Sequence, residues 1–232
     1  MQYQKILSTQ IVSTRLLLFC LINFLFLHVA CAQQQSTSIS FSEIWVWEYE
    51  DTKGNKREMA IYREPKLNYW LLTPDDANFR DKDEMTLWFI LKPNGEVIQA
   101  FQDAEMNNLA VIKHQLSLKK ITKLPKSWKP SGNVKSFGNA EYGFSTFSGK
   151  EYKIKYEKSD EKTSLFIGRS NADFSILALF NELNIDAKLP IQFPKNIPKN
   201  NITLLEHTVS SNFSLKYQYK YTTPTNYDIK YE

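Results

Sequence analysis

The fold is indicated most clearly by residues 85–102, which read MTLWFILKPNGEVIQAFQ. Two strand-like runs, Met85–Leu91 and Glu96–Gln102, stand on either side of Pro93-Asn94-Gly95. An Asn-Gly pair between such runs is the strongest short-range signal for a β-hairpin, because glycine readily adopts the positive φ that a tight turn needs. The stretch therefore predicts two antiparallel strands joined by a short turn.

The first strand of this hairpin is apolar on both faces. Successive side chains of a strand point to opposite sides, so Trp88 and Ile90 share one face. Leu87, Phe89 and Leu91 share the other. A sheet that is apolar on both faces needs a second layer, because water is a poor neighbour for that surface. Two interpretations stay open. Either helices cover this face as ordinary core, or a strongly curved sheet encloses an apolar cavity on its concave face, beneath the helices.

Further segments rich in β-branched and aromatic residues predict antiparallel strands on both sides of this hairpin. Ile39–Glu50 and Arg57–Arg63 flank the turn Lys53-Gly54-Asn55 and form a second hairpin, in which Trp45 and Trp47 point to one side. The remaining predicted strands are 67–73, 152–156, 163–168, 202–209 and 213–221, with a short edge at 228–232. In the C-terminal strands tyrosine alternates with lysine or glutamine, which indicates one buried and one solvated face.

Two segments show the period of a helix. The first is marked by Met106, Leu109, Ile112 and Leu116. The second is marked by Phe174, Leu177, Phe180 and Leu183, and it follows Ser170-Asn171-Ala172-Asp173, which resembles a capping box. Residues 124–149 contain two prolines and four glycines and are expected to be mostly loop. We therefore predict an α+β fold, mainly antiparallel β, in which a curved antiparallel sheet carries about two helices on one face in a single domain over residues 39–232.

The first 32 residues are typical of a secretory signal peptide. Basic residues precede an apolar run at 16–27, and Ala30-Cys31-Ala32 satisfies the small-residue rule for cleavage. We expect cleavage before Gln33, followed by a flexible polar tail at 33–38. The alternative is lipoprotein processing, in which Cys31 becomes the acylated first residue. In both cases we expect export to the periplasm, the periphery of the outer membrane or the extracellular space.

Charge and cysteine content narrow the possible chemistry. The whole chain of 232 residues has a net charge of +4, whereas residues 33–232 carry 27 Lys and Arg against 25 Asp and Glu and contain no cysteine. A chain without thiols has no thiol nucleophile and no cysteine-ligated metal. The near-neutral charge and the expected export argue against nucleic acid as a partner. We expect no cofactor, and contact with a membrane only through a lipid on Cys31.

Few residues point to catalysis. His114 and His207 are the two histidines after the leader, so a three-histidine metal site is excluded, and each is interpreted as a structural imidazole. The acidic cluster at 75–84 lacks the glycine and the distal glutamate of a calcium loop and is interpreted as a solvated turn. We therefore predict no catalytic residue and no metal site, and an enzyme is the less favoured class.

The order of strands, helix, strands, helix and strands over residues 39–232 resembles, in layout, the lipoprotein-carrier (LolA-like) half-barrels of Gram-negative bacteria. In that family a curved antiparallel sheet holds acyl chains beneath helices. No family motif is present from which a residue's role could be transferred.

The two apolar sheet faces lead to a functional expectation. We expect a non-enzymatic envelope protein that binds an apolar or lipid-like ligand against an aromatic sheet face. The residues expected to form that face are Trp45, Trp47, Trp88 and Phe89. The alternative is a structural or adhesive surface protein without a small-molecule ligand, in which the same residues are core and other envelope proteins are its partners.

Overall fold

The computed structural model describes residues 37–73, 85–102, 109–118, 128–139, 144–155, 159–180, 183, 189 and 200–231. The predicted signal peptide with Cys31 and the acidic cluster at 75–84 lie outside these residues. Of the predicted tail at 33–38, Thr37 and Ser38 are described and belong to a strand. The chain divides into two compact units, residues 1–38 with 229–232 and residues 39–228. The site described below lies within the second unit.

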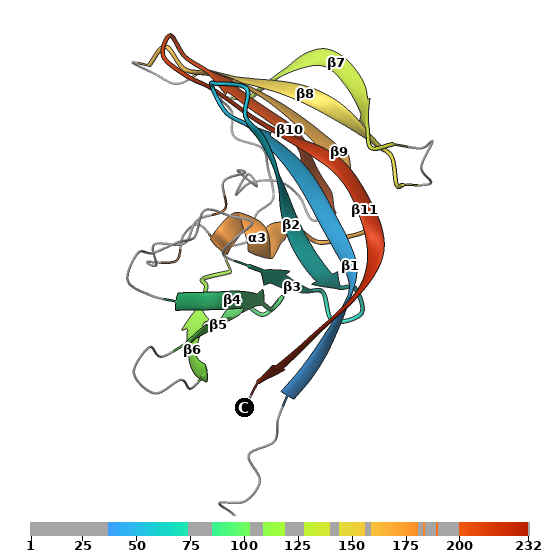
Figure 1. Cartoon of the computed structure of the whole chain (residues 1–232). Coiled ribbons are helices and arrows are strands. Elements are labelled where there is room, and N and C mark those ends of the chain that lie inside the picture. The colour runs from blue at the N-terminus through green and yellow to red at the C-terminus, as the bar shows by residue number, and fades with distance from the viewer. Residues whose placement is uncertain are drawn as a thin grey trace, which may run out of the picture. The chain divides into compact units, whose positions relative to one another are not determined.

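Eleven strands form one sheet within the described residues, and Figure 1 shows the longer ones bending along their length. The order across the sheet is β6-β5-β4-β3-β2-β1-β11-β10-β9-β8-β7. The strands are β1 Thr37–Glu50, β2 Lys56–Glu64, β3 Tyr69–Leu72, β4 Met85–Leu91, β5 Glu96–Gln102, β6 Leu109–Gln115, β7 Lys129–Phe137, β8 Phe147–Lys155, β9 Lys162–Arg169, β10 Asn201–Val209 and β11 Ser214–Tyr231. The prediction of a mainly antiparallel, curved sheet is confirmed, and the sheet is open.

The β4–β5 hairpin is confirmed with the predicted bounds. Phe89 pairs with Gln99 and Leu91 with Val97. The turn is closed by backbone hydrogen bonds, in which the Gly95 N–H donates to the Lys92 carbonyl at 2.9 Å and the Lys92 N–H donates to the Glu96 carbonyl at 2.8 Å. Gly95 has a φ of 87°, the left-handed conformation that favours glycine.

Both faces of β4 are buried, as the apolar pattern predicts. Trp88 and Ile90 on one face, and Phe89 and Leu91 on the other, are all buried. Leu87 departs from the predicted row and is 40% exposed, because the pairing register of β4 with β5 shifts between Thr86 and Trp88. The extra residue at such an irregularity has no partner in the neighbouring strand, so its side chain does not follow the alternation between the two faces.

The prediction of a helix around residues 106–116 is wrong for the described part, since Leu109–Gln115 forms strand β6. This strand pairs with β5, with Ile112 opposite Gln99. A short apolar run fits the period of a helix or of a strand. Here the strand form supplies hydrogen-bond partners to the backbone of β5 on the side that does not pair with β4. Leu109 and Ile112 are 43% and 45% exposed, so the expected apolar stripe is not a buried helix face.

The second predicted helix is present as α3 (Ser175–Phe180), and Figure 1 shows it on the concave side of the strands. The Asp173 carboxylate accepts a hydrogen bond from the Ser175 N–H at 3.0 Å, which caps the first turn. Residues 176–180 are all buried. Because α3 is the one helix among the described residues, the expectation of about two helices is not met. No helix in this part of the chain is long and apolar enough to cross a membrane.

The stretch predicted as mostly loop, 124–149, contains strand β7 and the start of β8. The register of β7 with β8 shifts between Pro130 and Val134, which lets an edge strand accommodate proline and glycine. The Glu151 carboxylate of β8 holds this edge, because it accepts hydrogen bonds from Asn133 Nδ2 at 2.7 Å and from the Ser131 hydroxyl. A third hydrogen bond comes from the Ser164 hydroxyl, and these donors lower the pKa of Glu151.

The alternating pattern of the C-terminal strand is explained by ion pairs opposite the tyrosines. Tyr217 and Tyr219 of β11 are buried. Lys220 lies 3.1 Å from a Glu48 carboxylate oxygen of β1, and Lys216 lies 3.5 Å from Glu50. One row of β11 therefore enters the core, while the other joins β1 through solvent-accessible ion pairs of modest strength.

The two hairpin turns provide a matched stability test. Gly54 and Gly95 both have φ near +80 to +90°, but a Cβ at Gly95 would lie 2.7 Å from the Leu116 carbonyl oxygen, whereas a Cβ at Gly54 would meet nothing within 4 Å. Gly95→Ala is expected to lower the free energy of unfolding by about 2 to 4 kcal/mol, and Gly54→Ala by about 1 to 2 kcal/mol. Urea denaturation of both variants measures this, and an equal loss would contradict the assigned contact.

Candidate functional site

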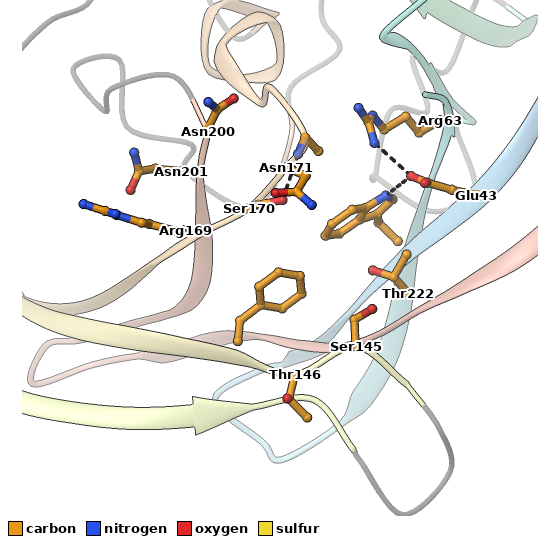
Figure 2. Close-up of a pocket in the computed structure, with 13 residues that line it drawn as sticks. Glu43, Arg63, Ser145, Thr146, Arg169, Ser170, Asn171, Asn200, Asn201 and Thr222 are labelled. Atoms are coloured by element: carbon orange, nitrogen blue, oxygen red, sulfur yellow. Dashed lines mark hydrogen bonds and ion pairs between the residues drawn. The ribbon is translucent and has the colours of Figure 1, made fainter. Parts of the chain in front are cut away.

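A cavity of about 1000 Å³ lies on the inner side of the sheet, beside the start of the α3 segment (Figure 2). Its described lining comes from β1, β2, β8, β9, β10 and β11 and from the segments next to β8, β9 and β10. The apolar lining residues are Trp45, Phe147 and Ala172. The polar ones are Glu43, Arg63, Ser145, Thr146, Arg169, Ser170, Asn171, Asn200, Asn201 and Thr222. The cavity is therefore amphipathic, and its size is that of a small-molecule site.

Trp45 is fixed in the cavity wall by a shared carboxylate. The Trp45 indole donates a hydrogen bond to Glu43 Oε2 at 3.1 Å, and Arg63 Nη1 donates to the same oxygen at 3.0 Å. Glu43 and Arg63 stand directly opposite each other in the β1–β2 pairing. Arg63 is almost fully buried, so this charge-assisted pair holds the indole in one orientation.

Arg63 also connects the sheet to the start of α3. Its Nε donates to the Asn68 side-chain oxygen at 3.2 Å, and its guanidinium lies 5.4 Å from the ring centre of Trp70. The Asn68 amide and the Trp70 indole both donate to the Asp173 carbonyl, at 3.3 and 3.2 Å. The segment that enters α3 is thereby bound to β3 and to the β2–β3 turn.

An aromatic cluster lies against this fixed indole. The ring centres of Trp45 and Phe147 are 5.9 Å apart, and Tyr219 lies 6.1 Å from Trp45 and 5.2 Å from Phe147. The Tyr219 hydroxyl and the Thr222 hydroxyl are 2.9 Å apart. Burial raises the pKa of Tyr219 to about 12, so its phenol remains neutral where it packs behind the lining residues Trp45 and Phe147.

The other wall is polar and is built where β9 ends and β10 begins. Arg169, the last residue of β9, pairs with Asn201, the first residue of β10. The Ser170 N–H donates to the Asn200 carbonyl at 2.8 Å, and Asn200 adopts a φ of 65°, a conformation that asparagine tolerates well. Figure 2 shows Arg169, Asn200 and Asn201 on one side and Glu43 and Arg63 on the other, with the Arg169 side chain directed away from Glu43 and Arg63.

All four expected ligand-binding residues are buried, and Trp45 is the one among them that belongs to the described cavity lining. Trp47 is fully buried, donates its indole N–H to the Thr203 carbonyl at 3.0 Å and lies 6.3 Å from Phe174. Phe89 packs against Phe180 of α3 at 5.2 Å, and Trp88 is buried outside the described cavity lining. Cys31, the alternative lipidation residue, lies outside the described residues.

His114 and His207, the two histidines considered in the sequence analysis, contact polar side chains that are not part of the described cavity lining. His114 Nε2 lies 2.9 Å from Gln99 Oε1, and His207 Nε2 lies 3.1 Å from the Ser214 hydroxyl. Across the described ranges, no group of three His, Cys, Asp or Glu side chains is arranged to hold a metal ion.

Sequence reasoning missed the polar part of the site. Counting outward from the Lys53-Gly54-Asn55 turn pairs Glu43 with Arg63, so this ion pair was within reach of the hairpin prediction. The meeting of Arg169 with Asn201 has no such signal, because a long connection separates the two residues in the sequence.

The sequence matches no protein-family model, and a search of the curated proteins gives no significant match. Where the layout of lipoprotein carriers led us to expect the first helix, the described residues form strand β6.

The buried phenol of Tyr219 predicts a pH effect on stability. Its pKa is raised in the folded chain, so its contribution is fully present below about pH 10 and is lost as the pH rises through about 12. Tyr219→Phe has no phenol to ionise. The stability advantage of wild type over this variant is therefore expected to shrink by about 1 to 2 kcal/mol between pH 9 and pH 12. Urea denaturation across this range measures the change.

Tyr227→Phe, which alters an exposed tyrosine of the same strand, is the control. Its free energy of unfolding should change with pH as that of wild type does. If the free energy of unfolding of Tyr219→Phe changed with pH as that of wild type does, the assigned burial of the phenol would be contradicted.

Proposed function

We propose that this chain is an exported, non-enzymatic envelope protein that binds an amphipathic small molecule in the cavity beside Trp45. The observation that carries the proposal is the cavity of about 1000 Å³, one wall of which contains the rings of Trp45 and Phe147. Ligand sites combine such an apolar surface with a few polar groups that orient the ligand. The leader sequence supports export, and acylation of Cys31 remains the alternative way of processing it.

The rigidity of the aromatic wall supports binding. The Trp45 indole is already fixed through Glu43 and Arg63, so little side-chain freedom is lost when a ligand packs against it. The lining residues Ser145 and Asn171 are exposed, which leaves the cavity accessible to solvent. Burying a short alkyl chain against the two rings would contribute about 0.8 kcal/mol for each methylene group.

The described lining favours binding over catalysis. Its one carboxylate, Glu43, accepts hydrogen bonds from both Arg63 and Trp45 and is therefore committed to structure. A general base must instead reach a proton of the substrate. The proposal accordingly assigns no catalytic residue and no cofactor.

A second candidate function is a structural or adhesive role without a small-molecule ligand. It is favoured by the part of the aromatic face that is covered by the chain's own side chains. There Phe174 packs on Trp47 and Trp70, and Phe180 packs on Phe89. For these residues the core interpretation is sufficient. The two functions differ only in whether the remaining cavity beside Trp45 takes a ligand.

Titration calorimetry with decanoate and octyl glucoside, both kept below their micelle concentrations, tests the proposal. Wild type is expected to bind one molecule per chain. Ser145→Trp introduces a large side chain at an exposed lining position, and we expect it to weaken binding at least tenfold without unfolding the protein.

Ser148→Trp is the matched control, because Ser148 is exposed on β8 and is not part of the described lining. It should bind as wild type does. Equal affinity of the Ser145→Trp variant would contradict the cavity as the site. Failure of wild type to bind either compound would favour the structural role.

A further inference from the structure

The described lining offers no unpaired charge beside its aromatic rings. Its charged residues are Glu43, Arg63 and Arg169, and the first two neutralise each other at 3.0 Å. Arg169 follows Gly168 in β9, where a Cβ would lie 2.5 Å from Leu204 of the aromatic core. Successive side chains of a strand point to opposite faces, so the Arg169 side chain projects from the face opposite that core. An ionic group of a ligand would therefore find no free partner of opposite charge next to the rings.

The polar groups on the aromatic side are uncharged. Asn171 and Ser145 are exposed, and neither side chain forms a hydrogen bond with another described residue. The Tyr219 hydroxyl donates to the Ser145 carbonyl at 3.4 Å and lies 2.9 Å from the Thr222 hydroxyl, so it holds Ser145 and Thr222 next to each other. Figure 2 shows Asn171, Ser145 and Thr222 around the middle of the lining, whereas the Arg169 side chain points away from it.

We propose that the polar end of the ligand is an uncharged sugar ring, which binds to Asn171, Ser145 and Thr222 while the alkyl part lies against Trp45 and Phe147. This inference rests on the proposed function and adds the chemical class of the headgroup. The ligand is then an amphiphile of the glycolipid class.

A sugar fits these side chains because each of its hydroxyl groups can both donate and accept a hydrogen bond. The Asn171 amide has two N–H donors and one carbonyl acceptor, and the hydroxyls of Ser145 and Thr222 can act in both ways. A carboxylate or a sulfate ester only accepts, so it would leave the acceptors of Asn171 and Ser145 without a donor. It would also lose hydration without gaining a cation, which costs free energy.

The exposure of the lining separates the two ends of the ligand. Trp45 is buried and Phe147 is half-buried, whereas Asn171 and Ser145 are exposed. An alkyl chain gains by leaving water against the two rings. The sugar hydroxyls that have no partner in the protein stay in contact with water beside Asn171 and Ser145. The ligand is therefore expected to bind in one orientation, with its sugar ring toward solvent.

Calorimetric titration with octyl glucoside, octyl sulfate and octanol, which share one alkyl chain, tests the inference. Wild type is expected to bind octyl glucoside about tenfold more tightly than either of the other two, which corresponds to one or two additional hydrogen bonds. In the double variant Asn171→Ala/Ser145→Ala this preference should disappear, while the affinity for octanol stays the same. Each single variant should lose part of it.

Asn212→Ala and Ser148→Ala are the matched controls. Asn212 is exposed in the turn between β10 and β11, Ser148 is exposed on β8, and neither belongs to the described lining. Both variants should prefer octyl glucoside as wild type does. An undiminished preference in the double variant would overturn the assignment of the headgroup to Asn171 and Ser145. Tighter binding of octyl sulfate than of octyl glucoside would overturn the uncharged headgroup.

Three outcomes separate this inference from the proposed function. Equal binding of the three octyl compounds by wild type would overturn the sugar headgroup and leave the cavity as a ligand site. Binding of none of them would overturn both. Glucose is included as the ring without a chain and is expected to bind at least tenfold more weakly than octyl glucoside. If it bound as tightly, the sugar ring would be supported as the recognised group and the alkyl part of the proposed function would be overturned.

Discussion

The shared carboxylate of Glu43 is the interaction on which the site depends. It binds Arg63 across the β1–β2 hairpin and the indole of Trp45 on its own strand, through the same oxygen. Arg63 in turn contacts Asn68, whose amide holds the segment that enters α3. The hairpin register places these groups together, because a slip by one residue would turn each side chain of β1 to the other face. The turn at Gly54 therefore helps to position Trp45 and Arg63, each nine residues away in the sequence.

The concave face is divided by this arrangement into a filled part and an open part. Phe174 and Phe180 of the α3 segment cover Trp47, Trp70 and Phe89, and this region is an ordinary aromatic core. Among the described residues, the cavity beside the α3 segment is bordered by polar residues at the end of β9 and at the start of β10. Because the helix is only six residues long, it covers a small area of the sheet. The helix is shorter than the sequence pattern predicted, and the described residues leave a cavity beside it.

The sequence predicts the strands well and the site only partly. The hairpins at Gly54 and Gly95 carry local turn signals, so their strands follow from the sequence. Leu109–Gln115 does not, because a seven-residue apolar run fits both periods and the choice depends on pairing with β5. The aromatic pattern predicted Trp45 as a site residue, but it predicted Trp47 equally, which is not part of the described cavity lining. Arg169 and Asn201 meet only through the β9–β10 pairing, which no local pattern encodes.

The central claim, that an alkyl chain lies against the indole of Trp45, is tested most directly by quenching with decanoate that carries bromine on its terminal carbon. Bromine quenches tryptophan emission only at close contact, and the chain contains five tryptophans, so a Trp45→Phe variant isolates the contribution of this one. The account predicts saturable quenching in wild type and its loss in Trp45→Phe, with binding of the probe, followed by calorimetry, retained. Undiminished quenching in the variant would contradict it.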